Sequence, residues 1–109
     1  MSILSSVTGN VGGDPQQRQA GNGTVVSFSV ATKTGREETV WVRCSAWDRV
    51  GERVQKVLRR GSRVVVFGTL KPREYERDGK TVTSLDLQVL DFEPLFDKPR
   101  RDDDPAADF

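Results

Sequence analysis

Strict alternation of apolar and polar residues is the feature of this chain that most constrains its fold. Residues 24–33 read TVVSFSVATK, and Val26, Phe28 and Val30 fall at every second position. A period of two places successive side chains on opposite faces of a β-strand. Residues 38–47 alternate in the same way, and the short turn at 34–37 between the two segments predicts a hairpin.

Further segments complete the predicted order of elements. Residues 3–8, 63–70 and 81–89 have strand character, whereas the glycine-rich stretch 9–23 is predicted to be mainly loop. The period changes to that of a helix after Asp48, the expected N-cap, and Gly61 is the expected stop. The apolar stripe of this short helix consists of Val50, Val54, Val57 and Leu58.

Five short strands with one helix between the third and the fourth predict an all-β protein. A small barrel removes the exposed sheet edges that five strands would otherwise leave. This order is that of the OB-fold, a five-stranded Greek-key barrel, and other small barrels are the alternative. We therefore expect one such domain at residues 1–96, followed by a disordered acidic tail at residues 97–109, where no periodicity remains.

Composition excludes several classes of protein. The chain has no histidine and one cysteine, Cys44, so catalytic triads, zinc sites and a disulfide framework are not expected. We expect no catalytic residues, no metal and no cofactor. No apolar run approaches the ~20 residues of a membrane span, so we expect no membrane contact. The single cysteine suits a reducing cytoplasm, where we expect the protein to lie.

Charge is divided unevenly along the chain. Residues 1–96 carry 14 basic and 11 acidic residues, a net +3, whereas residues 97–109 carry 3 and 5, a net −2. A mildly basic body with an acidic end suggests a domain that binds a polyanion and carries an interaction tail.

The segment 38–47 carries the most informative side chains. If Val42 and Cys44 point into a barrel, Trp41, Arg43 and Trp47 point outward. Flat aromatic rings beside a cation suit unstacked nucleic-acid bases and their phosphates. The alternative is that one or both tryptophans are buried in an oligomer interface or under the helix.

The predicted arm at residues 71–80 has two interpretations. It carries Tyr75 among basic residues, but Glu74, Glu76 and Asp78 dilute the charge. A solvated hairpin and a binding arm therefore explain its composition equally well. In OB-folds this loop borders the face that holds oligonucleotides, which favours a binding arm.

Taken together, several of these segments resemble the bacterial single-stranded DNA-binding protein family. The matching runs are GNVGGDP at 9–15 followed by Arg18, FSVAT at 28–32, the stretch 41–47, LRRGS at 58–62 and GTL at 68–70. The resemblance implies sequence-independent binding and protection of single-stranded DNA during replication, recombination and repair. It also implies a location in the cytoplasm, associated with the nucleoid.

The resemblance also implies roles for particular residues. Trp41, Trp47 and Tyr75 match the stacking aromatics of the family. The candidate phosphate contacts are Arg18, Lys33, Arg43, Lys71, Arg73 and Arg77. The family usually forms homotetramers, with dimers among its relatives, so a homo-oligomer is expected. Val42, however, stands where some members carry a histidine tied to tetramer formation.

The end of the chain resembles the acidic tip through which the family recruits replication and repair proteins. The tip residues are Asp102, Asp103, Asp104, Asp108 and Phe109. A solubilising tail is the simpler explanation of the same composition.

Two other classes of function remain open at this point. Acidic pairs such as Glu37 and Glu38, or Asp102 and its neighbours, suggest an enzyme with a metal site, but they lie in a turn and in the tail. An OB-fold protein of the primosome or one that binds RNA fits the same pattern as a binder of single-stranded DNA.

Overall fold

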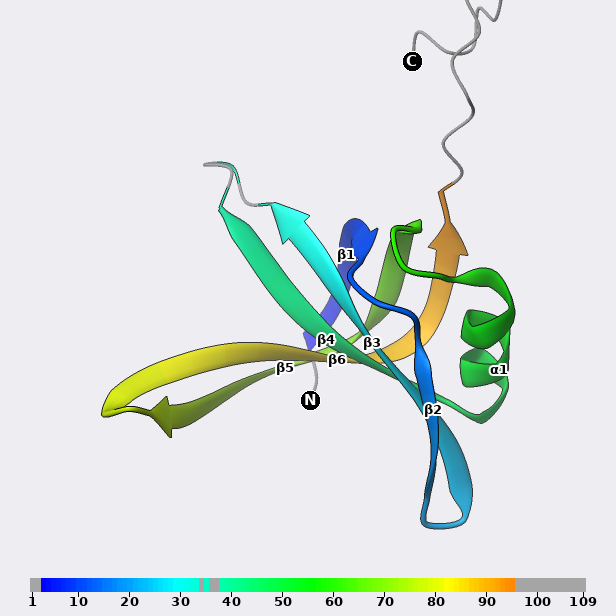
Figure 1. Ribbon diagram of the computed structural model, residues 1–109, viewed down its shortest axis with the longest axis horizontal. Coiled ribbons are helices and arrows are strands. Elements are labelled where there is room, and N and C mark those ends of the chain that lie inside the picture. The colour runs from blue at the N-terminus through cyan, green and yellow to red at the C-terminus, as the bar shows by residue number, and fades with distance from the viewer. Residues whose placement is uncertain (1–2, 34, 36–37, 96–109) are drawn as a thin grey trace, which may run out of the picture.

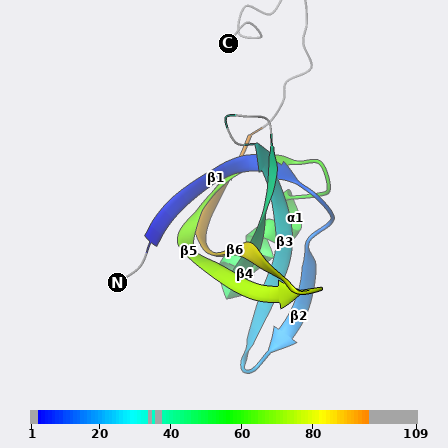
Figure 2. The ribbon, with the colours of Figure 1, turned by 90° about the vertical axis from the view of Figure 1, so that its left-hand side faces the viewer.

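The structure is a computed structural model that describes residues 3–33, 35 and 38–95. Its elements are β1 (Ile3–Val11), β2 (Gln16–Ala20), β3 (Gly23–Lys33), β4 (Thr39–Trp47), α1 (Asp48–Val57), β5 (Arg63–Arg77) and β6 (Lys80–Pro94). The strands form one sheet in the order β1-β5-β6-β4-β3-β2. β1 also pairs with β3, and this additional pairing closes five of the strands into a ring (Figures 1 and 2).

The ring confirms the predicted OB-fold barrel. Four of its strand pairs are antiparallel, and the pair β4–β6 is parallel, which closes the barrel as a Greek key. α1 lies between the third and fourth strands of the ring in sequence. Figure 2 looks along the barrel and shows α1 behind its far end, where the helix covers an opening that would otherwise expose the core.

The apolar side chains of the predicted alternating pattern fill the barrel. Val26, Phe28 and Val30 on β3 point inward and are buried, as are Val42 and Cys44 on β4. These side chains pack with others from every strand of the ring and from the helix. No polar or charged residue is among the buried ones in the described part of the chain. Burial of this continuous apolar core is the main term that favours folding.

The helix differs from the prediction at both ends. Trp47, not Asp48, occupies the N-cap position, and no side chain caps the helix there. The Asp48 carboxylate instead accepts a hydrogen bond from the backbone N–H of Thr24 at 3.3 Å, which ties the helix start to β3. Val54 and Leu58 are buried as expected, but Val57, the last residue of the helix, is 40% exposed.

The segment predicted as loop contains a strand. β2 pairs with β3 from Gln16 to Ala20 and forms a hairpin whose turn includes Gly21, at a φ of 61°. The sequence QQRQA shows no apolar alternation because β2 lies outside the ring and buries almost nothing. Backbone pairing, rather than a hydrophobic face, holds it in place.

A β-bulge interrupts the last strand. Phe67 pairs with Asp91 and Gly68 with Val89, so Leu90 is the extra residue. The bulge shifts the alternation, and Phe92 is therefore buried like Val89 although the two are an odd number of positions apart, namely three. Gly68 is required at this point because a Cβ there would overlap the Gln88 carbonyl oxygen.

The predicted arm is a long two-stranded ribbon formed by the distal parts of β5 and β6. The turn residues Asp78 and Gly79 have φ values of 53° and 78°, as a two-residue hairpin turn of the primed type requires. In Figure 1 the ribbon projects to the left, away from the side of the barrel where α1 lies.

Two predicted features lie outside the described residues: most of the turn at 34–37 and the tail at 97–109. Within the described ranges, no helix is long and apolar enough to cross a membrane.

Candidate nucleic-acid interface

The two tryptophans of β4 point away from the barrel interior. Trp41 is 53% exposed and Trp47 is 39% exposed, while their neighbours Val42 and Ala46 are buried. The alternation of β4 therefore places the rings outside the chain's own core, and the alternative of burial under the helix is wrong. The two residues are six positions apart, about 20 Å along an extended strand at roughly 3.3 Å per residue.

Strand register arranges polar and charged side chains in rows between the two rings. Arg43 on β4 lies beside Asp86 on β6, and Asp86 lies beside Lys71 on β5. The next row toward Trp47 is uncharged and contains Ser45 and Gln88. The two tryptophans at the ends are thus separated by one row of charges and one row of neutral hydrogen-bonding groups.

The predicted cation Arg18 lies at the Trp47 end of this face. It pairs with Val25 in the hairpin of β2 and β3, and Val25 pairs with Trp47. Val25 is buried between them although it points to the outer side of the sheet. Arg18 is exposed, so its guanidinium is available to a ligand that lies on Trp47.

The arm separates its charges by side. Because side chains alternate along a strand, Lys71, Arg73, Tyr75 and Arg77 share one side of the ribbon. Glu74 and Glu76 occupy the other side. Tyr75 is 40% exposed. The acidic residues that dilute the charge in the sequence therefore do not dilute it on the side of Tyr75.

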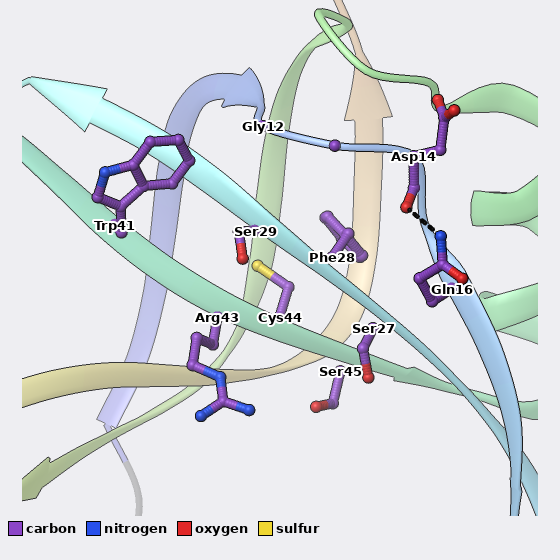
Figure 3. Close-up of a pocket in the computed structure, with 11 residues that line it drawn as sticks. Gly12, Asp14, Gln16, Ser27, Phe28, Ser29, Trp41, Arg43, Cys44 and Ser45 are labelled. Atoms are coloured by element: carbon purple, nitrogen blue, oxygen red, sulfur yellow. Dashed lines mark hydrogen bonds between the residues drawn. The ribbon is translucent and has the colours of Figure 1, made fainter.

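A pocket of about 430 Å³ lies beside Trp41 (Figure 3). Its floor includes Ser27, Ser29 and Ser45, and the segment after β1 borders it at Gly12. In Figure 3 the Trp41 ring is directed toward this segment and Arg43 away from it. A Cβ at Gly12 would overlap Cζ3 of the ring and lie 2.9 Å from Cη2, so only glycine allows this approach.

Three hydrogen bonds hold the segment that borders the pocket. The Asp14 carboxylate accepts a hydrogen bond from the backbone N–H of Arg60 at 2.9 Å, and the Asp14 carbonyl accepts one from the side-chain amide of Gln16 at 3.3 Å. The backbone N–H of Gly12 also donates to the Ser29 carbonyl at 2.9 Å. The wall opposite Trp41 is therefore fixed before any ligand arrives.

Lys33 lies in a separate groove of about 570 Å³ where β1 bridges β3 and β5. Arg63 lines the same groove, together with Asn10 and Thr39. Arg63 was not among the predicted contacts, because the sequence gives no sign that β5 begins beside the end of β3. The groove thus places two more cations, Lys33 and Arg63, beyond the Trp41 end of the face.

Two observations on the described side chains bear on whether they could act in catalysis. Burial raises the pKa of the Cys44 thiol to about 12, so Cys44 is a small core residue and not a nucleophile. In residues 3–33, 35 and 38–95, no group of three His, Cys, Asp or Glu side chains is placed to hold a metal ion. The face offers aromatic surface, cations and neutral hydrogen-bonding groups, which are the parts of a binding site for nucleic acid.

Sequence reasoning missed three further residues of this face: Gly12, Arg63 and Asp86. Asp86 was recoverable, because the alternation of Leu85 and Leu87 places it on the outer side. Gly12 and Arg63 depend on contacts between segments far apart in the chain, and no local pattern reveals them.

Comparison with known proteins gives one consistent result. The family model described as "Single-strand binding protein family" matches residues 5–95. A single-stranded DNA-binding protein of Mycobacterium leprae is 34% identical over 103 residues, covering 82% of this chain and 60% of that protein. One from Bifidobacterium longum is 32% identical over 101 residues, covering 82% of this chain and 46% of that protein.

A solved structure is similar as well. The small single-stranded DNA-binding protein from Streptomyces coelicolor matches with a TM-score of 0.72 and 26% identity, over 86% of this chain and 94% of that one. This chain thus spans about half to three fifths of the two relatives above but nearly all of the solved chain. Because the family model matches most of the length of this chain, the chain belongs to the single-strand binding protein family.

Proposed function

We propose that this chain binds single-stranded DNA without regard to overall sequence and without catalysis. The observation that carries the proposal is the outward face of β4, where two exposed tryptophans flank Arg43 and lie on the same sheet as the basic side of the arm. Family membership and the printed names of the relatives support the same ligand.

The geometry suggests how the strand binds. Bases stack on Trp41 and Trp47 while phosphates approach the cations in the rows between and around them. Tyr75 extends the aromatic surface onto the arm, and Lys33 with Arg63 extends the basic surface beyond Trp41. Duplex DNA binds poorly to such a face, because its bases are already stacked on one another.

Titration of the full chain with oligo-dT tests the proposal. Stacking on indole rings is expected to quench tryptophan fluorescence, and the logarithm of the affinity is expected to fall by about 0.7 per neutralised phosphate for each unit of log salt. Trp41→Ala and Trp47→Ala should each weaken binding by about 1–3 kcal/mol, the usual contribution of one stacked base. Fluorescence anisotropy of a labelled oligonucleotide measures these changes.

Val57→Ala is the matched control, since Val57 is an exposed apolar residue on α1, away from the face. Its affinity for oligo-dT should equal that of the unchanged protein. Equal affinity for duplex and single-stranded DNA of the same length would contradict the proposal. A clear preference for RNA over DNA would favour instead the relative of the primosome or the RNA binder considered above.

The biological setting follows as part of the same proposal. A protein that covers single-stranded DNA acts where strands are separated, in replication, recombination and repair, on the chromosome in the cytoplasm. We further propose that the protein is a homo-oligomer, either a tetramer or a dimer. Finally, we propose that the acidic tip at residues 102–109 recruits partner proteins, on the strength of its sequence alone.

A further inference from the structure

A shallow pocket of about 260 Å³ lies beside Trp47, on the outer side of β4, β5 and β6. Trp47 is its exposed apolar residue, while Ser45, Thr69 and Gln88 supply neutral hydrogen-bonding groups. An aromatic surface with hydrogen-bonding groups at its edge suits a nucleobase, which has a flat face and a polar rim.

Asp86 is the acidic residue of this pocket, and its carboxylate has unused hydrogen-bonding capacity. Oδ1 is buried and accepts no hydrogen bond from the described residues. Oδ2 lies 3.9 Å from Nη1 of Arg73, which is an ion pair but too long for a hydrogen bond. The side chain as a whole is 34% exposed, so a ligand with N–H groups approaches the carboxylate from the side of Oδ2.

The neighbours of Asp86 determine which part of a nucleotide can face it. Arg43 and Lys71 flank it in register, one on each side, and Arg73 lies on the adjacent row of the arm. Phosphates are attracted to these three cations and repelled by the carboxylate. The nucleotide that crosses this row therefore directs its base, not its phosphate, toward Asp86, and Arg73 is drawn away from Oδ2 to a phosphate.

We propose that this pocket holds one nucleobase and that Asp86 accepts a hydrogen bond from its exocyclic amino group. This inference rests on the binding of single-stranded DNA proposed above. Cytosine presents an N4 amino group to a carboxylate, a known pairing in the recognition of bases. Thymine has only N3–H, between two carbonyl oxygens that repel the carboxylate. The pocket thus favours cytosine over thymine on a face that otherwise ignores sequence.

The test compares two pyrimidines on matched variants of the full chain at mildly alkaline pH. Labelled oligo-dC and oligo-dT of equal length are titrated against the unchanged protein, Asp86→Asn and Asp91→Asn. Asp91 is the control because its carboxylate is paired with Arg53 at 3.1 Å, on a different surface. The ratio of the dT to the dC dissociation constant should fall roughly fivefold in Asp86→Asn and stay unchanged in Asp91→Asn.

A second probe deletes the amino group from the DNA. Replacing cytosine by 2-pyrimidinone, which lacks the amino group, should weaken binding to the unchanged protein and have no effect on Asp86→Asn. If circular dichroism shows that Asp86→Asn does not fold, the comparison of cytosine with 2-pyrimidinone on the unchanged protein alone tests whether the amino group is bound.

Equal gains in affinity for dC and dT in Asp86→Asn would overturn the proposal, because the carboxylate would then act only through its charge. Equal binding of oligo-dC and the 2-pyrimidinone oligonucleotide by the unchanged protein would also overturn it. Failure of the unchanged protein to bind either pyrimidine oligonucleotide would overturn the proposed function as well, so the two failures are distinguishable.

Discussion

Gly12 sets the distance between the Trp41 ring and the segment that follows β1. We expect Gly12→Ala to displace the ring, because the added Cβ would overlap it. Affinity for oligo-dT should fall by part of the ~1–3 kcal/mol that a stacked base contributes, and the tryptophan emission spectrum should shift. Because the ring is 53% exposed and can shift, the stability measured by thermal unfolding should fall by less than the ~1–3 kcal/mol that overpacking costs in a close-packed core.

Gly13→Ala is the matched control, since a Cβ at Gly13 meets no atom within 4 Å. It should leave both the affinity and the emission spectrum unchanged. If the two variants lost affinity equally, the contact between Gly12 and Trp41 would not be what holds the ring in place.

Single residues were predictable from the sequence where their orientation depends on local alternation alone. Trp41 and Trp47 point outward because Val42 and Cys44 must point inward, and ten residues of sequence suffice to see this. The surroundings of Asp86 were not predictable. Its neighbours Arg43 and Lys71 belong to strands that meet it only through the parallel and antiparallel pairings of β6.

At the scale of elements, β1 leaves one of its edges open. Residues 3–10 pair with β5, whereas only Asn10 and Val11 pair with β3. Along Ile3–Thr8 the described chain thus offers an unpaired edge, and apolar surface is exposed by Leu4 on β1, Phe67 on β5 and Leu90 on β6. Open edges and apolar patches of this kind favour association with another copy.

Light scattering is therefore expected to report a mass of two or four chains, with and without oligo-dT. The double substitution Leu4→Glu and Phe67→Glu should lower the mass, because it places charges on the apolar patch. Val57→Glu, a charge on the exposed part of α1, should leave the mass unchanged. A monomeric mass for the unchanged protein would contradict the proposed oligomer.

The sequence predicted those helices and strands that bury a clear apolar face, and it missed the strand that does not. The five barrel strands and α1 each carry a hydrophobic face, and each was identified. β2 has no such face, and its sequence QQRQA gives no period to detect. The bulge at Leu90 was missed because it depends on the pairing of two strands and not on either strand alone.

At the scale of the whole molecule, charge divides the chain into a basic body and an acidic end. Deleting residues 102–109 should leave the affinity for single-stranded DNA equal or higher, because the acidic residues compete with phosphates for the same cations. Capture of partner proteins by the immobilised chain should be abolished.

Replacing Asp102, Asp103, Asp104 and Asp108 by Asn, with Phe109 retained, separates charge from length. This variant should reproduce the gain in DNA affinity if the charge is responsible. A loss of DNA affinity on deletion would contradict a tip that recruits partners and competes with DNA, because such a tip does not contribute to DNA binding.

The charge separation on the arm depends on a single turn. Asp78 and Gly79 fix which residues of β5 oppose which residues of β6, and side chains alternate from there along both strands. A slip of β5 by one residue would exchange its two sides and present Glu74 and Glu76 where Arg73 and Tyr75 now lie. The geometry of this one turn thus determines whether the outer side of the arm attracts or repels an anionic ligand. The turn contributes to ligand selection in this way, although neither of its residues is a cation.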